Sequence, residues 1–88
     1  MANYLLVYDL NSPGKDYKNL IKHLERYPTR WHFQKSGWIV GPADSALGVA
    51  QAAWQHMDSN DKLFVQVLTE DCAWGGYDQK GSDFLRSL

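Results

Sequence analysis

The run YLLVYDL, residues 4–10, constrains the fold more than any other stretch of the sequence. Its aromatic and β-branched residues favour a strand, in which successive side chains point to opposite faces of a sheet. One face then carries Tyr4, Leu6, Tyr8 and Leu10, and the other carries Leu5, Val7 and Asp9. Since both faces are apolar along most of their length, we expect both sides of this sheet to be covered. Asp9 is the exception: such a carboxylate is favoured only at the strand's exit, where amides of the NSPG turn can donate to it, or beside another partner.

The segments that follow predict a mixed helix and strand order. The turn signal NSPG ends the first strand, and apolar residues at helical spacing then predict a helix over 15–27, with Asp16 in its first turn. Residues 30–34 and 36–41 read as two strands with a tight connection near Lys35 to Gly37. A second helix over 42–57, capped by Asp44 or Ser45, precedes a strand over 62–70. The order is βαββαβ, the ferredoxin-like α+β arrangement, with two helices on one face of an antiparallel sheet.

The C-terminal tail is the least regular part of the sequence. Its glycines predict no regular structure before Ser82, which is placed to cap a short helical turn in DFLRSL. The segment from Trp74 to Tyr77 permits two interpretations. Its rings can stack on a ligand or a base, or the segment is a bend that folds the tail over the sheet or onto a partner subunit.

Length and composition predict one domain, residues 1–88, that associates with itself. At 88 residues the chain buries a modest share of its surface, yet it is 44% hydrophobic and contains four Trp and five Tyr. Two helices can hide only one face of the sheet, so a sheet-to-sheet or edge-mediated homodimer is the simplest cover for the rest. We expect Tyr8, Trp74 and Tyr77 at that interface.

Charge and cysteine content narrow the classes of function. The net charge of −1 argues against a dedicated, tight nucleic-acid binder. The distribution is uneven, however, because residues 1–40 carry six Lys and Arg against three acids and residues 41–88 carry three against seven. The single Cys72 excludes an intrachain disulfide. With no apolar run of membrane-spanning length and no signal-like start, the expectation is a cytoplasmic protein without a membrane partner.

Basic residues predict a contact surface for a phosphate backbone. On the first predicted helix, the face opposite the apolar stripe carries Lys15, Lys18, Lys22 and Arg26, and Arg30 and Lys35 extend the set. The alternative is a solvated helix face, which is routinely rich in lysine.

The strand ending in Tyr8 and Asp9, followed by a helix and then by Gln34, Ser36 and Trp38 in FQKSGWIV, resembles a known group. These residues and their order resemble the CRISPR-associated endonuclease of the spacer-acquisition complex (the Cas-two family), the virulence-associated protein D ribonucleases and the small SinR-family proteins. The resemblance spans roughly residues 3–69 and implies a ferredoxin-like homodimer.

The resemblance also implies roles for particular residues. Asp9 would face its copy across the dimer axis and bind a divalent metal, Mg²⁺, for hydrolysis of a phosphodiester, with RNA preferred over DNA. Ser36 would contact the phosphate or the metal shell, although a serine there can also simply satisfy the turn. Tyr8 or His32 is a further candidate for a phosphate contact or proton donor; for His32 the alternative is a half-exposed cross-strand position. Two alternatives stay open. One is a non-catalytic dimeric module of a toxin-antitoxin, mobile-element or phage-defence system, and the other is a small-molecule sensor that uses the open sheet and the aromatic tail.

Overall fold

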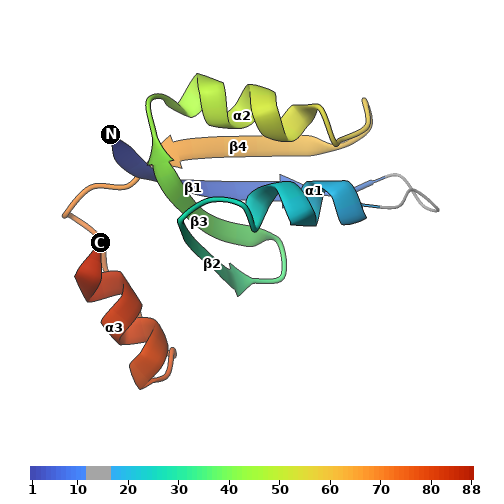
Figure 1. Cartoon of the computed structure of the whole chain (residues 1–88). Coiled ribbons are helices and arrows are strands. Elements are labelled where there is room, and N and C mark those ends of the chain that lie inside the picture. The colour runs from blue at the N-terminus through green and yellow to red at the C-terminus, as the bar shows by residue number, and fades with distance from the viewer. Residues whose placement is uncertain (12–16) are drawn as a thin grey trace.

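The computed structural model describes residues 1–11 and 17–88 and has an α+β fold (Figure 1). The elements in chain order are β1 (Ala2–Asp9), α1 (Lys18–Leu24), β2 (Thr29–Gln34), β3 (Gly37–Ala43), α2 (Ala46–Trp54), β4 (Lys62–Val67) and α3 (Gln79–Ser87). The first six elements follow the expected order βαββαβ, and α3 is an addition to it. Lys15, Asp16 and most of the predicted NSPG turn lie outside the described residues.

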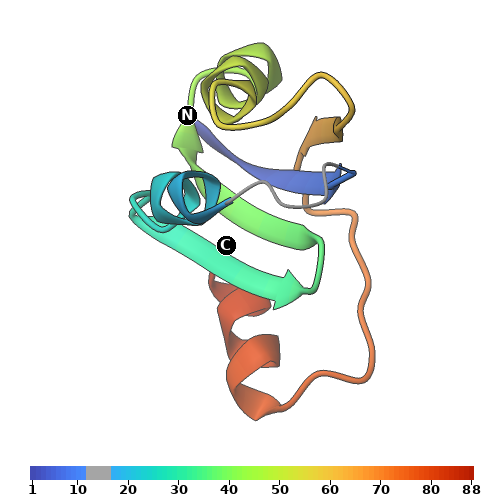
Figure 2. The ribbon, with the colours of Figure 1, turned by 90° about the vertical axis from the view of Figure 1, so that its right-hand side faces the viewer.

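The four strands form one antiparallel sheet in the order β2-β3-β1-β4. β1 and β3 are central, and β2 and β4 are the two edges. Both α1 and α2 lie on one face of the sheet, which we call the helix face, whereas the C-terminal tail passes along the other, the open face (Figure 2). The fold predicted from the sequence, with two helices on one side of an antiparallel sheet, is confirmed.

The core lies between the helix face and the two helices. β1 directs Tyr4, Leu6 and Tyr8 into it, and α1 contributes Leu20 and Leu24. The apolar stripe predicted for the first helix is therefore confirmed, although the regular helix is shorter than the predicted 15–27. A spacing of four residues brings the two leucines onto one side of the helix, where burial stabilises the fold by about 1.5–3 kcal/mol for each side chain.

Ser45 begins α2. Its hydroxyl oxygen accepts a hydrogen bond from the backbone N–H of Gly48 at 3.0 Å, which satisfies one of the unpaired donors at a helix start. Of the two predicted capping residues, Asp44 is not the cap. The helix carries no charged residue between Ala46 and Trp54.

The predicted irregular tail is wrong in its second half, because α3 begins at Gln79 and not after Ser82. Asp78 is its N-cap and accepts a hydrogen bond from the N–H of Gly81 at 2.8 Å. Gly81 lies inside the helix because a Cβ there would approach the ring of Trp31 to 2.9 Å. The glycine that read as a helix breaker permits the helix to contact the sheet closely.

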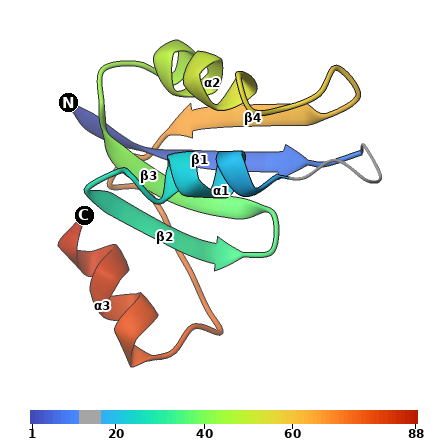
Figure 3. The same cartoon turned by 45° about the vertical axis from the view of Figure 1, so that its right-hand side comes forward.

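The tail folds over the open face of its own chain. Trp31 on β2 contacts the rings of Phe33, Tyr77 and Phe84, with centroid distances of 5.1–5.6 Å. α3 lies beside β2 in every view (Figures 1, 2 and 3). The sequence left open whether the tail covers its own sheet or a partner, and the structure shows the first.

None of the helices within residues 1–11 and 17–88 is long and apolar enough to cross a membrane.

Candidate functional site

Asp9 and Ser36 lie together at one end of the sheet. Asp9 is the last residue of β1, exposed, and on the open face, since it follows Val7 by two positions. Ser36 lies in the two-residue turn between β2 and β3. The N–H of Tyr8 donates to the carbonyl oxygen of Ser36 at 3.0 Å, which holds the turn against the end of β1. The strand exit expected for Asp9 is confirmed.

The neighbours of Asp9 include a lysine. In the ladder between β1 and β4, Asp9 is directly opposite Lys62, a position from which opposite charges attract. The backbone carbonyl oxygen of Asp9 accepts a hydrogen bond from the Asn11 side chain at 3.3 Å. Of the turn amides that could satisfy the Asp9 carboxylate, that of Asn11 donates to Asp61 instead, and the rest of the turn lies outside the described residues.

One carboxylate and one hydroxyl are a sparse ligand set for a metal ion. Within the residues that the structure describes, no group of three or more His, Cys, Asp or Glu is placed to hold a metal. Mg²⁺ binds proteins through as few as one or two carboxylates when substrate phosphates complete its shell. Asp9 therefore fits Mg²⁺ only with ligands from a substrate or a second subunit.

Most of the basic residues lie apart from Asp9, on the helix face, whereas Lys35 is in the turn beside Ser36 at the Asp9 end of the sheet. We define the basic surface as the exposed residues Lys18, Lys22, Arg26, Arg30 and Lys35. Lys18 and Lys22 lie one turn apart on α1. On β2, Arg30 alternates with Trp31, whose ring faces the tail, so the Arg30 side chain belongs to the helix face. Lys15 lies outside the described residues.

An exposed aromatic ring lies within the basic surface. The imidazole of His32 stacks on the buried indole of Trp38, with a centroid distance of 4.2 Å and an interplanar angle of 11°. The carbonyl oxygen of Lys35 lies 3.1 Å from the His32 Nε2 atom. Stacking on Trp38 and the contact with the Lys35 carbonyl oxygen hold the His32 ring in place and leave it exposed. In the sequence His32 lies between Arg30 and Lys35. The half-exposed cross-strand position expected for His32 agrees with this geometry.

The three residues expected at a dimer interface are in other surroundings. Tyr8 is 7% exposed in the core, where its hydroxyl oxygen accepts a hydrogen bond from the Trp38 Nε1 atom at 3.2 Å. Its place in an interface is a wrong prediction, because the face of β1 that carries Tyr8 is the one that the helices cover. Tyr77 and Trp74 contact their own chain: the Tyr77 hydroxyl accepts from the Gln34 amide, and the Trp74 indole donates to Ser82.

Asp61 is a buried carboxylate that sequence reasoning did not single out. It is 5% exposed and accepts hydrogen bonds from the N–H of Asn11 at 2.7 Å, the N–H of Asp58 at 2.7 Å and the hydroxyl of Tyr17 at 2.8 Å. These donors come from both ends of the β1–α1 connection and from the α2–β4 loop. In the sequence, Asp61 is recognisable only as the last residue of the turn signal DSND. Its hydrogen bonds show that it joins the two loops.

Two histidines meet where α1 lies beside the end of α2. The rings of His23 and His56 are 5.1 Å apart, and the buried Nε2 atom of His23 has no hydrogen-bond partner among residues 1–11 and 17–88. Burial, and then the nearby charges of His56 and Arg26, lower the pKa of His23. The pair was assigned no role from the sequence.

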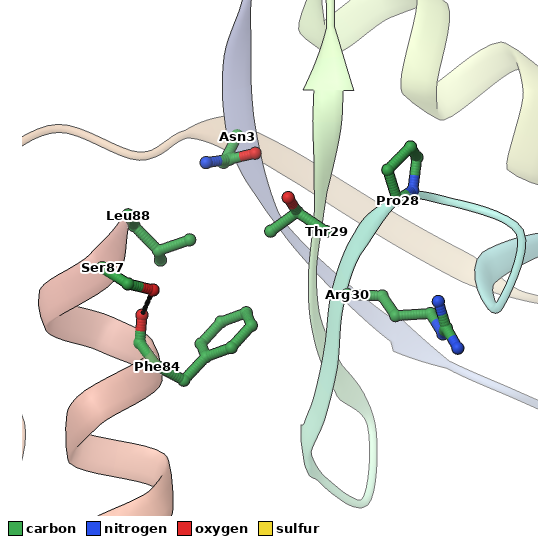
Figure 4. A pocket seen from close by; sticks show the side chains of 7 residues that line it. All are labelled: Asn3, Pro28, Thr29, Arg30, Phe84, Ser87 and Leu88. Atoms are coloured by element: carbon green, nitrogen blue, oxygen red, sulfur yellow. Dashed lines mark hydrogen bonds between the residues drawn. The ribbon is translucent and has the colours of Figure 1, made fainter.

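Two hollows lie between the tail and the sheet. The larger, of about 610 Å³, is lined mostly by apolar residues of β1, β2, β3 and the tail, among them Leu5, Trp31 and Trp74. The smaller, of about 470 Å³, lies between α3 and the start of β2, and Figure 4 shows Phe84 directed toward β2 while the Arg30 guanidinium points away from α3. Neither hollow includes Asp9 or Ser36.

Comparison of the chain with protein-family models, with curated protein sequences and with solved structures finds no match.

Proposed function

We propose that the chain is a homodimeric nucleic-acid-binding protein that contacts the phosphate backbone of single-stranded RNA through the basic surface. The observation that carries this proposal is the positive charge and the exposure of the basic side chains in residues 17–37. Residues 17–37 contain a single acid, Glu25, and the five basic side chains of the basic surface are all exposed. Such a surface attracts phosphates even on a chain whose net charge is −1.

The exposed His32 ring supports a single-stranded ligand. Bases of a single strand are free to stack on aromatic side chains, whereas bases in a duplex are already stacked on one another. A ring held flat on Trp38 between Arg30 and Lys35 offers one base a stacking partner while the flanking cations contact its phosphates. Stacking of this kind is tolerant of sequence, so we propose little base specificity.

The test is binding of a mixed-sequence single-stranded RNA, followed by fluorescence anisotropy at several salt concentrations. Lys22→Glu with Arg26→Glu should weaken binding at least about tenfold and flatten the salt dependence, because the slope follows the number of phosphates neutralised, about 0.7 per contact for single strands. Lys80→Glu, on α3, is the matched control and should leave binding unchanged. Equal affinities for all three proteins would contradict the proposal.

A second candidate function is metal-dependent cleavage at Asp9, favoured by the position of Ser36 beside the end of β1. Its test is RNA cleavage with Mg²⁺ and with a chelator. Asp9→Asn should abolish any Mg²⁺-dependent cleavage, and Asp83→Asn, which alters an exposed acid on α3, should not. Cleavage that survives Asp9→Asn would exclude this site, and binding without cleavage would favour the non-catalytic module.

A further inference from the structure

β4 is an edge strand with α2 lying alongside it, while the β2 edge has α3 beside it (Figures 1 and 3). Among the described residues, no strand pairs with the outer side of β4. The sequence of β4, KLFVQV, has strong strand propensity and one charge, at Lys62. Native proteins usually protect such an edge with charge, proline or cover, because its unpaired backbone groups can pair with another chain. We propose that β4 pairs with β4 of a second copy in an antiparallel twofold dimer. This inference rests on the homodimer of the proposed function and names its surface.

The backbone of β4 suits pairing with itself. The N–H of Leu68 donates to the carbonyl oxygen of Asn3, so the even-numbered residues of β4 exchange hydrogen bonds with β1. The N–H and C=O groups of Leu63, Val65 and Val67 then point to the free edge. These three residues are symmetric about Val65. A twofold axis there pairs Leu63 with the partner's Val67 and Val65 with the partner's Val65, so every outward group finds an opposite.

The side chains above this edge are complementary under the same axis. Leu47 and Val67 are 67% and 43% exposed, and the N-terminal end of α2, which holds Leu47, lies beside the C-terminal end of β4 (Figures 1 and 3). At the other end of β4, a hollow of about 680 Å³ is lined by Trp54, Lys62 and Leu63, with Ala50 and Gln51. In the twofold dimer, Leu47 and Val67 of each copy therefore lie over the hollow beside Trp54 and Leu63 of the other copy.

Charge also favours this pairing over a like-charged clash. α2 has no charged residue, and Lys62 lies at the start of β4 while Glu70 and Asp71 follow its end. Antiparallel alignment about Val65 brings Lys62 of each copy next to the acidic end of the other. The β4 edge is therefore complementary to the β4 edge of a second copy.

The dimer has a consequence for Asp9. Asp9 is opposite Lys62, three residues from the axis along β4 and one strand further from it. With a rise of about 3.3 Å per residue and strands about 4.8 Å apart, the two Asp9 residues lie about 25 Å apart. In this dimer each Asp9 acts alone, in contrast to the paired carboxylates that the family resemblance implies.

The experiment measures mass by light scattering over a dilution series for the full chain and three variants. The wild type should be a dimer, and Val67→Lys and Leu47→Lys should each shift it to monomer. Phe64→Lys is the matched control, because Phe64 is 59% exposed on the open face and points away from α2. Circular dichroism checks that each variant is folded.

Cross-linking tests the register. In a Cys72→Ser background, Val65→Cys should form a disulfide-linked dimer under mild oxidation, since hydrogen-bonded antiparallel pairs have Cα atoms about 5.5 Å apart, within disulfide range. Val7→Cys, on the open face, should not. A monomeric wild type would overturn the inference. So would a dimer that survives both Val67→Lys and Leu47→Lys. If such a dimer is lost in Phe64→Lys, the two copies pair through their open faces instead.

The outcomes separate this inference from the proposed function. A monomer that binds RNA would overturn the β4 dimer and leave the RNA proposal in place. A dimer that Val67→Lys dissociates but that binds no RNA would overturn the RNA proposal alone.

Discussion

Asp61 shows how one buried residue can order two loops at once. Its two carboxylate oxygens accept hydrogen bonds from Asn11, Tyr17 and Asp58, which lie up to fifty positions from it in the sequence. A buried carboxylate is costly without such partners, and the partners in turn would lose their acceptor without it. The loops at the Asp9 end of the sheet are therefore arranged around a structural carboxylate.

Asp61→Ala should lower the free energy of unfolding by about 2–3 kcal/mol, because it leaves partly buried N–H groups without an acceptor. Tyr17→Phe, which removes a single donor, should cost about 1 kcal/mol. Urea denaturation measures both values. Ser59→Ala, an exposed position in the same loop, is the control and should change stability by less than about 0.5 kcal/mol. A neutral Asp61→Ala would mean that the loops hold their positions independently.

At the level of elements, the contact between α1 and the segment after α2 brings two histidines together. His23 meets the rings of His56 and Tyr27, and its Nε2 atom is buried without a hydrogen-bond partner in the described part of the chain. A proton on His23 would lie beside His56 and Arg26. Burial and these two neighbours lower the pKa of His23 in the folded chain, while the unfolded chain keeps the ordinary value.

This difference predicts that stability is lost in acid. The contribution of His23 is fully present above the ordinary histidine pKa of about 6.5 and is lost as the pH falls from there through the lowered pKa of the folded state. Urea titrations across this range should show a smaller loss for His23→Gln than for the wild type. His32→Gln, which alters a histidine on β2, should match the wild type, and equal losses for all three proteins would contradict the prediction.

For the whole molecule, the tail decides how much of the open face remains exposed. Phe84 and Tyr77 pack on Trp31, and Gly81 allows α3 to approach closely enough for these contacts. Without the tail, apolar side chains of β2 and β3 would face solvent on the side of the sheet that has no helices of the core.

Gly81→Ala should therefore loosen the tail, although alanine is ordinarily the better helix former by about 1 kcal/mol. Its Cβ would meet the Trp31 ring at 2.9 Å, so α3 must shift. Faster proteolysis within residues 69–77 and stronger binding of an apolar dye are the expected results. Gly75→Ala is the matched control, because nothing lies within 4 Å of a Cβ there. If both variants behave alike, the close contact at Gly81 does not hold the tail.

Local patterns in the sequence were sufficient for the βαββαβ order. The alternation in residues 4–10 predicted a strand, and the spacing of Leu20 and Leu24 predicted a helix, because each pattern reflects contacts between neighbouring turns or pleats. The exit position of Asp9 and the turn at Ser36 followed from the same reasoning.

Features that depend on distant residues were not predictable in this way. Tyr8 was assigned to an interface because alternation gives two faces but does not say which one the helices cover. The first turn of α3, before the predicted helical turn in DFLRSL, was missed because the need for Gly81 comes from Trp31, fifty positions away. Asp61 read as part of a turn because its donors at Asn11 and Tyr17 belong to another loop.

The sheet separates Asp9 from the basic residues of α1, and this separation affects how the two groups of residues can change. Residues that share no contact usually contribute independently, so the free-energy effects of Arg26→Glu and Asp9→Asn should add in a double variant. Random substitution could then remove one property of the molecule without weakening the other. A lineage built on this framework would then keep the exposed basic residues of α1 long after the residues around Asp9 had drifted.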